Sequence, residues 1–529
     1  MIKFQSIFKE NKKKFLFIFL LLLVSFLYGY PEILSFRPYS IHQWRQSDCL
    51  SIAVNYYKDD LNFFEPAVHW VGTADGKTVS ECPIIYYTVA QLWKIFGYHE
   101  FIFRIVNVFI VFLGLYCFYK LVYGLLSDYF WAFSIPIFLF TSPILVFYSN
   151  NFTADAPAFG LALVGCYLLW SSIKKGQKVR YYASFLFFLL AGLIKISSLI
   201  SFIAILLIHV YSIFFSEKKR LWFYKWYNVL PYFFVFAVLI AWYKYAIFYN
   251  QNNVSGVFLT GIYPIWDLDQ SAIKNIWLSL KNDLLPAYFN NKALSILLIL
   301  FVTLFFFYKK VNKYLFYLTL LVFLGVLVYL ILFYQAFTVH DYYLTNLLIF
   351  IPLPLITLLE MLSRNYNRYF HKIQLKIFFA ATVLLLTYET AVINRAKYFI
   401  NDKLVRTNFV VSDGFVNQWV NFHREYASKL KVYENLTPHL RKLGIKRSDR
   451  VLSLQDHSIN ISLCFMDQKG FTAFGYGDLT LDKRMQLYKQ NGVQYLVSDT
   501  SYYFDQKTIH SYVQSKIGHF QNIGIYLLK

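Results

Sequence analysis

The sequence carries little charge for its length, and acidic residues are especially scarce. Only 15% of its 529 residues are charged, and Asp and Glu together number 29. A soluble globular domain carries about 25% charged residues. Hydrophobic residues make up 58% of the chain, and apolar runs of about 18 or more residues, each long enough to cross a bilayer, recur along most of it. The composition excludes an ordinary soluble domain and predicts an α-helical polytopic membrane protein.

Cysteine is also scarce, and its spacing excludes one kind of metal or redox site. The five cysteines form no CxxC pair, so no zinc or redox motif of that kind is present. Cys117 and Cys166 lie in apolar runs and are predicted to pack in the core. Cys49 and Cys82 fall in one predicted outer loop, where they either form a disulfide or pack as free thiols.

The positive charges indicate a membrane topology rather than a nucleic-acid partner. The formal net charge is +22, but Lys and Arg gather in short links between apolar runs, as retention on the cytoplasmic side requires. If the N-terminus is cytoplasmic and about eleven spans alternate in direction, these links share one side. They are "KKGQKVR" at 174–180, "EKKR" at 217–220, "KKVNK" at 309–313 and "RNYNRYFHK" at 364–372.

The apolar runs predict a membrane domain over residues 1–393. Its first span follows three Lys and resembles a signal peptide, but it lacks a small-residue cleavage site, which predicts a retained signal anchor. A long outer loop, 31–100, comes next. The expected spans are 15–30, 101–123, 130–148, 158–173, 181–194, 197–215, 229–248, 293–308, 314–335, 344–362 and 374–392.

The composition changes at about residue 394. Short strand-like segments, "VLSLQD", "GFTAFG", "VQYLVSD" and "IGIYLLK", alternate there with helical segments such as "LDKRMQLYKQNG". This alternation predicts a small α/β domain over 394–529. Because the span count is odd, the domain is expected on the extracytoplasmic face.

Polar residues gather at the predicted outer ends of the spans. Charged groups in or near a span are costly and are functional candidates by default. The opposite ends carry mainly Lys and Arg, so this one-sided cluster predicts a site at the outer membrane interface. Its members are His42, Arg45, Asp48, Glu81, Asp155, Lys195, His340 and Asp341.

Each of these residues also has a structural interpretation. Arg45 and Asp48 are three apart, so they are either a local ion pair or a general base beside a phosphate-binding cation. Asp155 precedes Pro157 and could cap the next helix. Lys195 could extend its ammonium group to the interface.

Two further structural interpretations concern residues near helix ends. Glu81 precedes Cys82 and Pro83 and could begin the helix "PIIYYTVAQLWKIFG". "HDYY" at 340–343 could belong to an interfacial aromatic belt, where Tyr is common.

Five segments in a fixed order resemble the bacterial branch of glycosyltransferase family 39. That family includes protein O-mannosyltransferases and lipid A aminoarabinose transferases. The resemblance covers roughly residues 1–390 and none of the tail. Its segments are "HQWRQSD", "SECPIIYYTVAQLWKIFGYHEFIFRIVNVF", "NNFTADAPAFGLAL", "LAGLIKISSL" and "HDYYLTNLLIFIPL".

The resemblance implies the type C glycosyltransferase fold, with many membrane helices, a first outer loop that carries juxtamembrane helices, and an active site facing the periplasm or lumen. Asp48 matches the first-loop Asp regarded as catalytic, and Asp155 matches the second-loop Asp close to it. Glu81 matches the acidic residue of the E-K-P-P segment in aminoarabinose transferases. Cys82 departs from the pattern, because those enzymes have Lys there.

The Lys that this chain lacks contacts the donor phosphate in aminoarabinose transferases. The resemblance therefore implies that Arg45, Lys195 or His340 supplies the cation here. Tyr342 and Tyr343 match an aromatic stretch near the lipid phosphate.

Together these features predict an inverting glycosyltransferase with Asp48 as its base. It would move a sugar from a polyprenyl-phosphate donor to an extracytoplasmic hydroxyl group of a protein, lipid or glycan. No DxD motif for a nucleotide sugar is apparent, which agrees with a lipid-linked donor. A divalent metal among Asp48, Glu81 and Asp155 is possible, but no metal or other cofactor is predicted. Lys, Asn, Ile, Phe and Tyr usage suggests an AT-rich bacterial genome and hence the bacterial inner (plasma) membrane.

Three rival interpretations remain. A transporter or flippase of lipid-linked sugars would also be polytopic, but it needs polar groups near the membrane midplane and access from both sides. An O-antigen ligase-like or polymerase-like protein would also use lipid-linked glycans. If instead the tail is a binding module on a membrane scaffold, replacing Asp48 would alter only stability.

Overall fold

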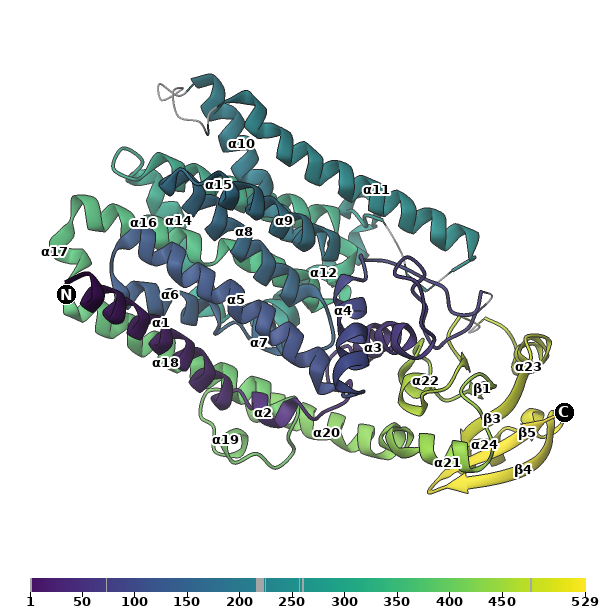
Figure 1. Ribbon diagram of the computed structural model, residues 1–529. Helices are drawn as coiled ribbons and strands as arrows, with labels where there is room; N and C mark the ends of the chain where they lie inside the picture. Colours follow the sequence, from purple (N-terminus) through teal and green to yellow (C-terminus); the bar gives the residue numbers. More distant parts are fainter. Residues whose placement is uncertain are drawn as a thin grey trace.

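A computed structural model shows a bundle of long helices with a small sheet domain at one end (Figure 1). It describes residues 2–72, 74–215, 223, 225–255, 257–258, 261–475 and 478–529. The basic link 217–220 lies outside these residues. Seven helices in the described part are long and apolar enough to cross a membrane, which makes this a multi-pass membrane protein. They are α5 (Phe101–Leu126), α8 (Asp155–Lys175), η1–α10 (Ile196–Phe215), η3–α11 (Trp226–Asn252), α15 (Lys313–Leu332), η7–α16 (Asp341–Asn365) and α18 (Ile373–Ala396).

Two bent helix pairs raise the number of candidate spans to nine. The pair α6 (Tyr129–Leu139) and α7 (Pro143–Ser149) bends by 78°, and 270–288 bends by 92° against α14 (Asn291–Phe306). The other expected spans are α1 (Ile2–Leu27), whose apolar part follows three Lys, and α9 (Lys178–Ile194), which has 17 residues. The total of eleven stays a prediction.

The single helix expected over 130–148 is wrong, because the chain breaks between α6 and α7. Pro143 lacks an amide hydrogen and disfavours helical geometry in the residue before it. Ser142 takes an extended conformation and caps α7 by accepting a hydrogen bond from the Leu145 amide. The break leaves α7 at the end of the bundle near the C-terminal domain (Figure 1).

The loop after α1 folds into short helices on that same end of the bundle. A buried guanidinium fixes the loop there, because Arg104 of α5 donates to the carbonyl oxygen of Phe36 at 3.1 Å. The amphipathic helix that follows Pro83 packs against the longer helix before it, and its buried residues include Trp93. The loop helices are α2 (Tyr30–Ile33), α3 (Gln43–Lys58) and α4 (Ile84–Phe96).

Helices α5 and α8 touch through glycine, and this contact positions the start of α8. A Cβ atom on Gly114 would lie 2.5 Å from the carbonyl oxygen of Gly160, so a larger residue would push the helices apart. Small residues at such crossings let membrane helices approach closely. Remaining short helices of the membrane region are η4 (Ile265–Asp267), α12 (Gln270–Ser279), η5 (Leu280–Leu284), α13 (Leu285–Tyr288), η6 (Tyr334–Thr338) and α17 (Asn367–Phe370).

The C-terminal region contains a five-stranded sheet in the order β2-β1-β3-β5-β4. β1 pairs in parallel with β2 and β3, whereas β5 pairs antiparallel with β3 and β4. The four expected strands are present as β1 (Arg450–Ser453), β2 (Gly470–Thr472), β3 (Val493–Asp499) and β5 (Ile523–Leu528). Sequence reasoning missed β4 (Val513–Phe520), an edge strand with three exposed residues in a row.

Helices surround this sheet and connect it to the membrane region. A long helix, α20, follows α18 and leads toward the sheet (Figure 1). The helices of the C-terminal region are α19 (Lys403–Arg406), α20 (Asp413–Lys429), η8 (Lys431–Asn435), α21 (Thr437–Lys442), α22 (Ile461–Met466), α23 (Leu481–Gln490), α24 (Thr500–Asp505) and α25 (Lys507–His510).

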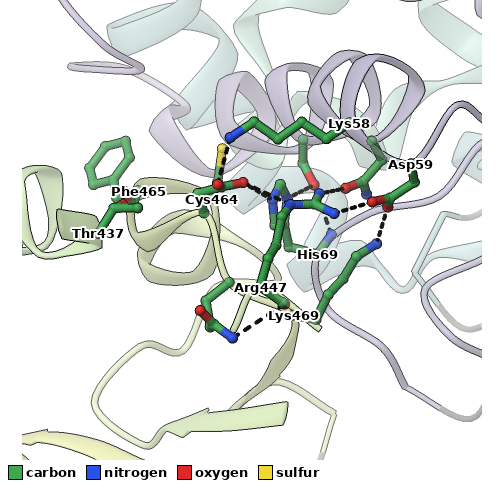
Figure 2. A network of polar contacts seen from close by, with 12 residues as sticks. Lys58, Asp59, His69, Thr437, Arg447, Cys464, Phe465 and Lys469 are labelled. Atoms are coloured by element: carbon green, nitrogen blue, oxygen red, sulfur yellow. Dashed lines mark hydrogen bonds and ion pairs between the residues drawn. The ribbon is translucent and has the colours of Figure 1, made fainter. Parts of the chain in front are cut away.

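An ionic network joins the C-terminal domain to α3, and we call it the interdomain clasp (Figure 2). It comprises Lys58, Asp59, Arg447, Asp467 and Lys469. Asp467 lies 2.6 Å from Lys58 and 2.9 Å from Arg447, while Asp59 pairs with Arg447 and, at 2.9 Å, with Lys469. Each carboxylate in the clasp thus contacts at least two cations, one reason that the sheet domain is docked on the loop helices.

Candidate active site

A cavity of about 670 Å³ opens beside the start of α3, and we call it the α3 cavity. Its walls combine the N-terminal part of α3, the segment before α4, the end of α9 and the segment from η6 to η7. Aromatic and aliphatic side chains such as Tyr243 and Phe333 form much of the lining. Six residues predicted from the sequence also line it: Arg45, Glu81, Lys195, His340, Tyr342 and Tyr343.

Arg45 binds Glu81 rather than Asp48. The guanidinium Nη2 atom lies 2.5 Å from the Glu81 carboxylate, and both side chains are mostly buried. The Arg45 guanidinium also lies over the Phe258 ring, 4.8 Å from its centre. A local Arg45–Asp48 ion pair is therefore wrong, because a carboxylate 36 residues further along the chain folds back onto Arg45.

Glu81 is held in its ionised form. Ser80 and Tyr86 donate hydrogen bonds to its two oxygens, in addition to the contact from Arg45. Burial alone would raise the pKa of Glu81, but the charges of Arg45 and Lys195 outweigh it and lower the pKa to about 2. A carboxylate with so low a pKa is a weak base at neutral pH.

Lys195 and Asp155 form the second ion pair at the cavity. Lys195 Nζ lies 2.8 Å from Asp155 Oδ1. The ammonium group also lies over the rings of Tyr343 and Tyr342, at 4.3 and 5.2 Å from their centres. The predicted capping role of Asp155 is wrong, because Ala154 occupies the cap position and Asp155 already belongs to α8. Tyr342 and Tyr343 line the cavity.

Asp48 lies on α3 one helical turn after Arg45, but it does not line the cavity. Its carboxylate is fully buried. Oδ1 accepts a hydrogen bond from the Asn460 side chain at 2.8 Å, and Oδ2 has no hydrogen-bond partner in the described part of the chain. Burial raises the pKa of Asp48 to about 7, although Arg45 and Asn460 act in the opposite direction. This pKa suits a base at neutral pH.

His340 lines the cavity, and His42 lies beside it. Burial and the neighbouring His42 lower the pKa of His340 to about 4, so His340 is neutral at pH 7. His42 Nε2 lies 3.1 Å from Asp341 Oδ1, and Tyr148 donates to the same oxygen. The sequence placed His42 and Asp341 at this end but did not predict their contact.

The three predicted carboxylates do not form one cluster. Asp48, Glu81 and Asp155 take Asn460, Arg45 and Lys195 as their respective partners. Among the described residues, no three His, Cys, Asp or Glu side chains are grouped so that they could hold a metal ion. Cys49 and Cys82 are both buried free thiols, so the disulfide alternative is wrong.

Comparisons with known proteins give one clear result, at the level of the fold. No family model matches this sequence. No curated protein matches it at the sequence level. Two solved structures of ArnT from Cupriavidus metallidurans match it in shape, and each alignment covers 97% of both chains. The structure bound to undecaprenyl phosphate has a TM-score of 0.57 at 11% identity, and the apo structure has 0.54 at 10%. The chain therefore has a type C glycosyltransferase fold, as the resemblance implied.

Proposed function

We propose that this protein is a membrane glycosyltransferase that moves a sugar from a polyprenyl-phosphate donor to an acceptor hydroxyl group. The observation that carries the proposal is the α3 cavity, where two cations meet aromatic walls at one end of a bundle of apolar helices. The fold adds support, because an ArnT structure of the same fold was solved with undecaprenyl phosphate bound.

The charges of the cavity suit a donor with a single phosphate. Arg45 and Lys195 are each neutralised by one carboxylate, Glu81 and Asp155 respectively. A sugar phosphodiester carries one negative charge, so only one of the two cations has to exchange its carboxylate for the donor. Arg45 is suited to this exchange because its planar guanidinium binds phosphate through two parallel hydrogen bonds.

Asp48 acts as the general base in this proposal. The acceptor oxygen forms a bond to the anomeric carbon as the bond from that carbon to the phosphate oxygen breaks. The bonding electron pair leaves with polyprenyl phosphate, and the hydroxyl proton passes to the unpartnered Oδ2 of Asp48. Arg45 and Lys195 stabilise the charge that develops on the leaving phosphate. A single displacement of this kind inverts the anomeric configuration.

The buried position of Asp48 requires a side chain to move before the acceptor can reach it. Because Asp48 is fully buried and the Arg45–Glu81 pair lies one helical turn away on the cavity wall, we propose that the acceptor hydroxyl reaches Asp48 only after Arg45 turns from Glu81 toward the donor phosphate. Donor binding thus precedes access to the base, so the empty enzyme does not expose a reactive carboxylate to water.

The test compares wild-type protein with Asp48→Asn, and with Asp413→Asn as a control at an exposed acid. Release of polyprenyl phosphate is measured from a panel of synthetic polyprenyl-phosphate sugars, with a cell-envelope extract as the source of acceptor. Wild type and control should turn over one donor with inversion. Asp48→Asn should be slower by about 100- to 10,000-fold while melting at the same temperature.

Two outcomes would overturn parts of this proposal. Equal turnover by wild type and Asp48→Asn would remove Asp48 from the base role. No turnover of any donor, combined with tight binding of one, would instead favour a transporter of lipid-linked sugars.

A further inference from the structure

Asn460 occupies the N-cap position of α22 in the C-terminal domain, but its side chain bonds outside this helix. Asn in this position commonly caps its own helix. Here the side chain makes no capping bond. Instead, its amide Nδ2 donates to Asp48 Oδ1 at 2.8 Å, and its Oδ1 accepts from the backbone N–H of Trp70 at 2.8 Å. Both ends of the amide are therefore used by the loop after α1.

The contact is fully enclosed. Asn460 and Asp48 are both completely buried, although they are 412 residues apart in sequence. Helix α22 packs against α3, and the two lie side by side in Figure 1. An amide that donates to one carboxylate oxygen fixes the rotation of the group, so the other oxygen keeps one direction.

Backbone contacts beside Asn460 hold this arrangement in place. The backbone N–H of Val71 donates to the carbonyl oxygen of Gly470 at 2.9 Å. The backbone N–H of Gly470 donates to the carbonyl oxygen of His69 at 3.2 Å. The loop thus pairs with the edge of β2 in the sheet. The interdomain clasp lies close to this pairing, with His69 beside it (Figure 2). The loop and the C-terminal domain therefore meet through backbone pairing beside the Asn460 side chain.

We infer that Asn460 is a positioning residue for the Asp48 carboxylate, and that the C-terminal domain therefore completes the active site. This inference rests on the proposed role of Asp48 in proton transfer. By donating to Oδ1, the amide stabilises the ionised carboxylate and leaves Oδ2 to accept the proton. The domain thus supplies part of the chemistry in addition to any contact with the acceptor.

Other charged or titratable groups also act on Asp48. Arg45 and Cys49 are on the same helix, Glu81 comes from the segment before α4, and Asp456 and Cys464 come from the C-terminal domain. All of these remain when Asn460 alone is replaced. A change in the titration of Asp48 in such a variant therefore reports the loss of the amide.

The test titrates Asp48 directly and then through activity. The infrared band of its protonated carboxyl group is identified by its absence in Asp48→Asn. In Asn460→Ala the midpoint of this band should rise by about one pH unit, because the ionised form loses a donor. In Asn460→Asp it should rise further, because a second carboxyl group stands within hydrogen-bonding distance. Asn522→Ala removes an exposed Asn–Asp contact of the same domain, to Asp499, and should leave the midpoint unchanged.

The pH dependence of the reaction rate provides a second test, because a purely structural role of Asn460 would not change it. The rate of Asn460→Ala should be about fivefold below wild type at pH 7, since one further pH unit of midpoint leaves about 9% instead of about 50% of the carboxylate ionised, and the difference should shrink above pH 8. An unchanged midpoint and an unchanged pH profile in a folded variant would overturn the inference. If Asn460→Ala does not fold, the near-isosteric Asn460→Leu, which also removes the donor and adds no charge, gives the same decision.

The two proposals fail in different ways. A shifted infrared midpoint with no transferase activity in the wild type would leave the contact standing and remove the proposed function. An active wild type with no shift would retain the function and remove the positioning role.

Discussion

The two ends of α3 carry similar charges in different surroundings. At its start, Arg45 has one carboxylate partner and lies on the wall of a cavity. At its end, Lys58 and Asp59 enter the interdomain clasp, where each carboxylate contacts at least two cations. A single pair beside a cavity is able to exchange its partner for a ligand, whereas a multiply connected network holds two domains together. The number of ionic partners, rather than the charge itself, distinguishes the proposed ligand-binding residue Arg45 from the residues that hold the two domains together.

The largest expected difference between the two ends of α3 is their response to acid: the reaction rate should fall, whereas the clasp should remain intact. Asp48, with a pKa of about 7, must be ionised to accept a proton, so the rate should rise through pH 7 and level off above it. At pH 5 the rate should be roughly a hundredfold below this plateau, since two pH units leave about 1% of the carboxylate ionised. Initial rates from pH 5 to 9 measure this. A flat profile would indicate Glu81 as the base, because its pKa is about 2.

The clasp should survive the same change of pH. Burial alone would raise the pKa of Asp467, but its contacts to His69 and Lys58 hold that pKa well below its ordinary value. A carboxylate with a depressed pKa adds stability that is lost only as the pH falls through its folded pKa, which here lies far below 5. The melting temperature should therefore show no loss of this contact at pH 5. A loss of rate together with unfolding there would weaken the assignment to Asp48.

The next largest difference should be in the affinity for polyprenyl phosphate, when one cation at each end of α3 is replaced in turn. Arg45→Gln removes a guanidinium from the α3 cavity and should weaken the binding of polyprenyl phosphate by about ten- to a hundredfold, as expected for charge-assisted hydrogen bonds. Lys58→Gln changes the same helix at the clasp and should leave this affinity unchanged. Titration of both purified variants with polyprenyl phosphate measures the effect. Equal weakening in the two would mean that Arg45 acts on the fold rather than on the ligand.

The smallest effect should come from weakening the clasp itself. Arg447→Met removes two ion pairs, and we expect it to lower the free energy of unfolding by about 1–3 kcal/mol, which a thermal melt would show as a drop of a few degrees. Lys429→Met breaks an exposed pair with Glu425 and should cost less than about 0.5 kcal/mol. Equal melting temperatures for the two variants would contradict the structural role of the clasp.

Several site residues could be predicted because their signals are local. Apolar runs next to polar clusters led to Arg45, Glu81 and Lys195, which line one cavity. Their pairing could not be predicted, because each partner comes from another part of the chain. Asn460 gave no signal at all, since an Asn at a helix start is ordinary and its target is 412 residues away.

The sequence by itself determined most of the membrane helices and most strands of the tail, because hydrophobic periodicity and length act over a few turns of chain. Only the tertiary structure decided the counterions of the cavity and the docking of the C-terminal domain on α3. Burial and ion pairing at these places depend on groups that folding brings together. Asp48 shows the division most clearly: the sequence marked it as a candidate base, but its pKa depends on surroundings that include a residue of another domain.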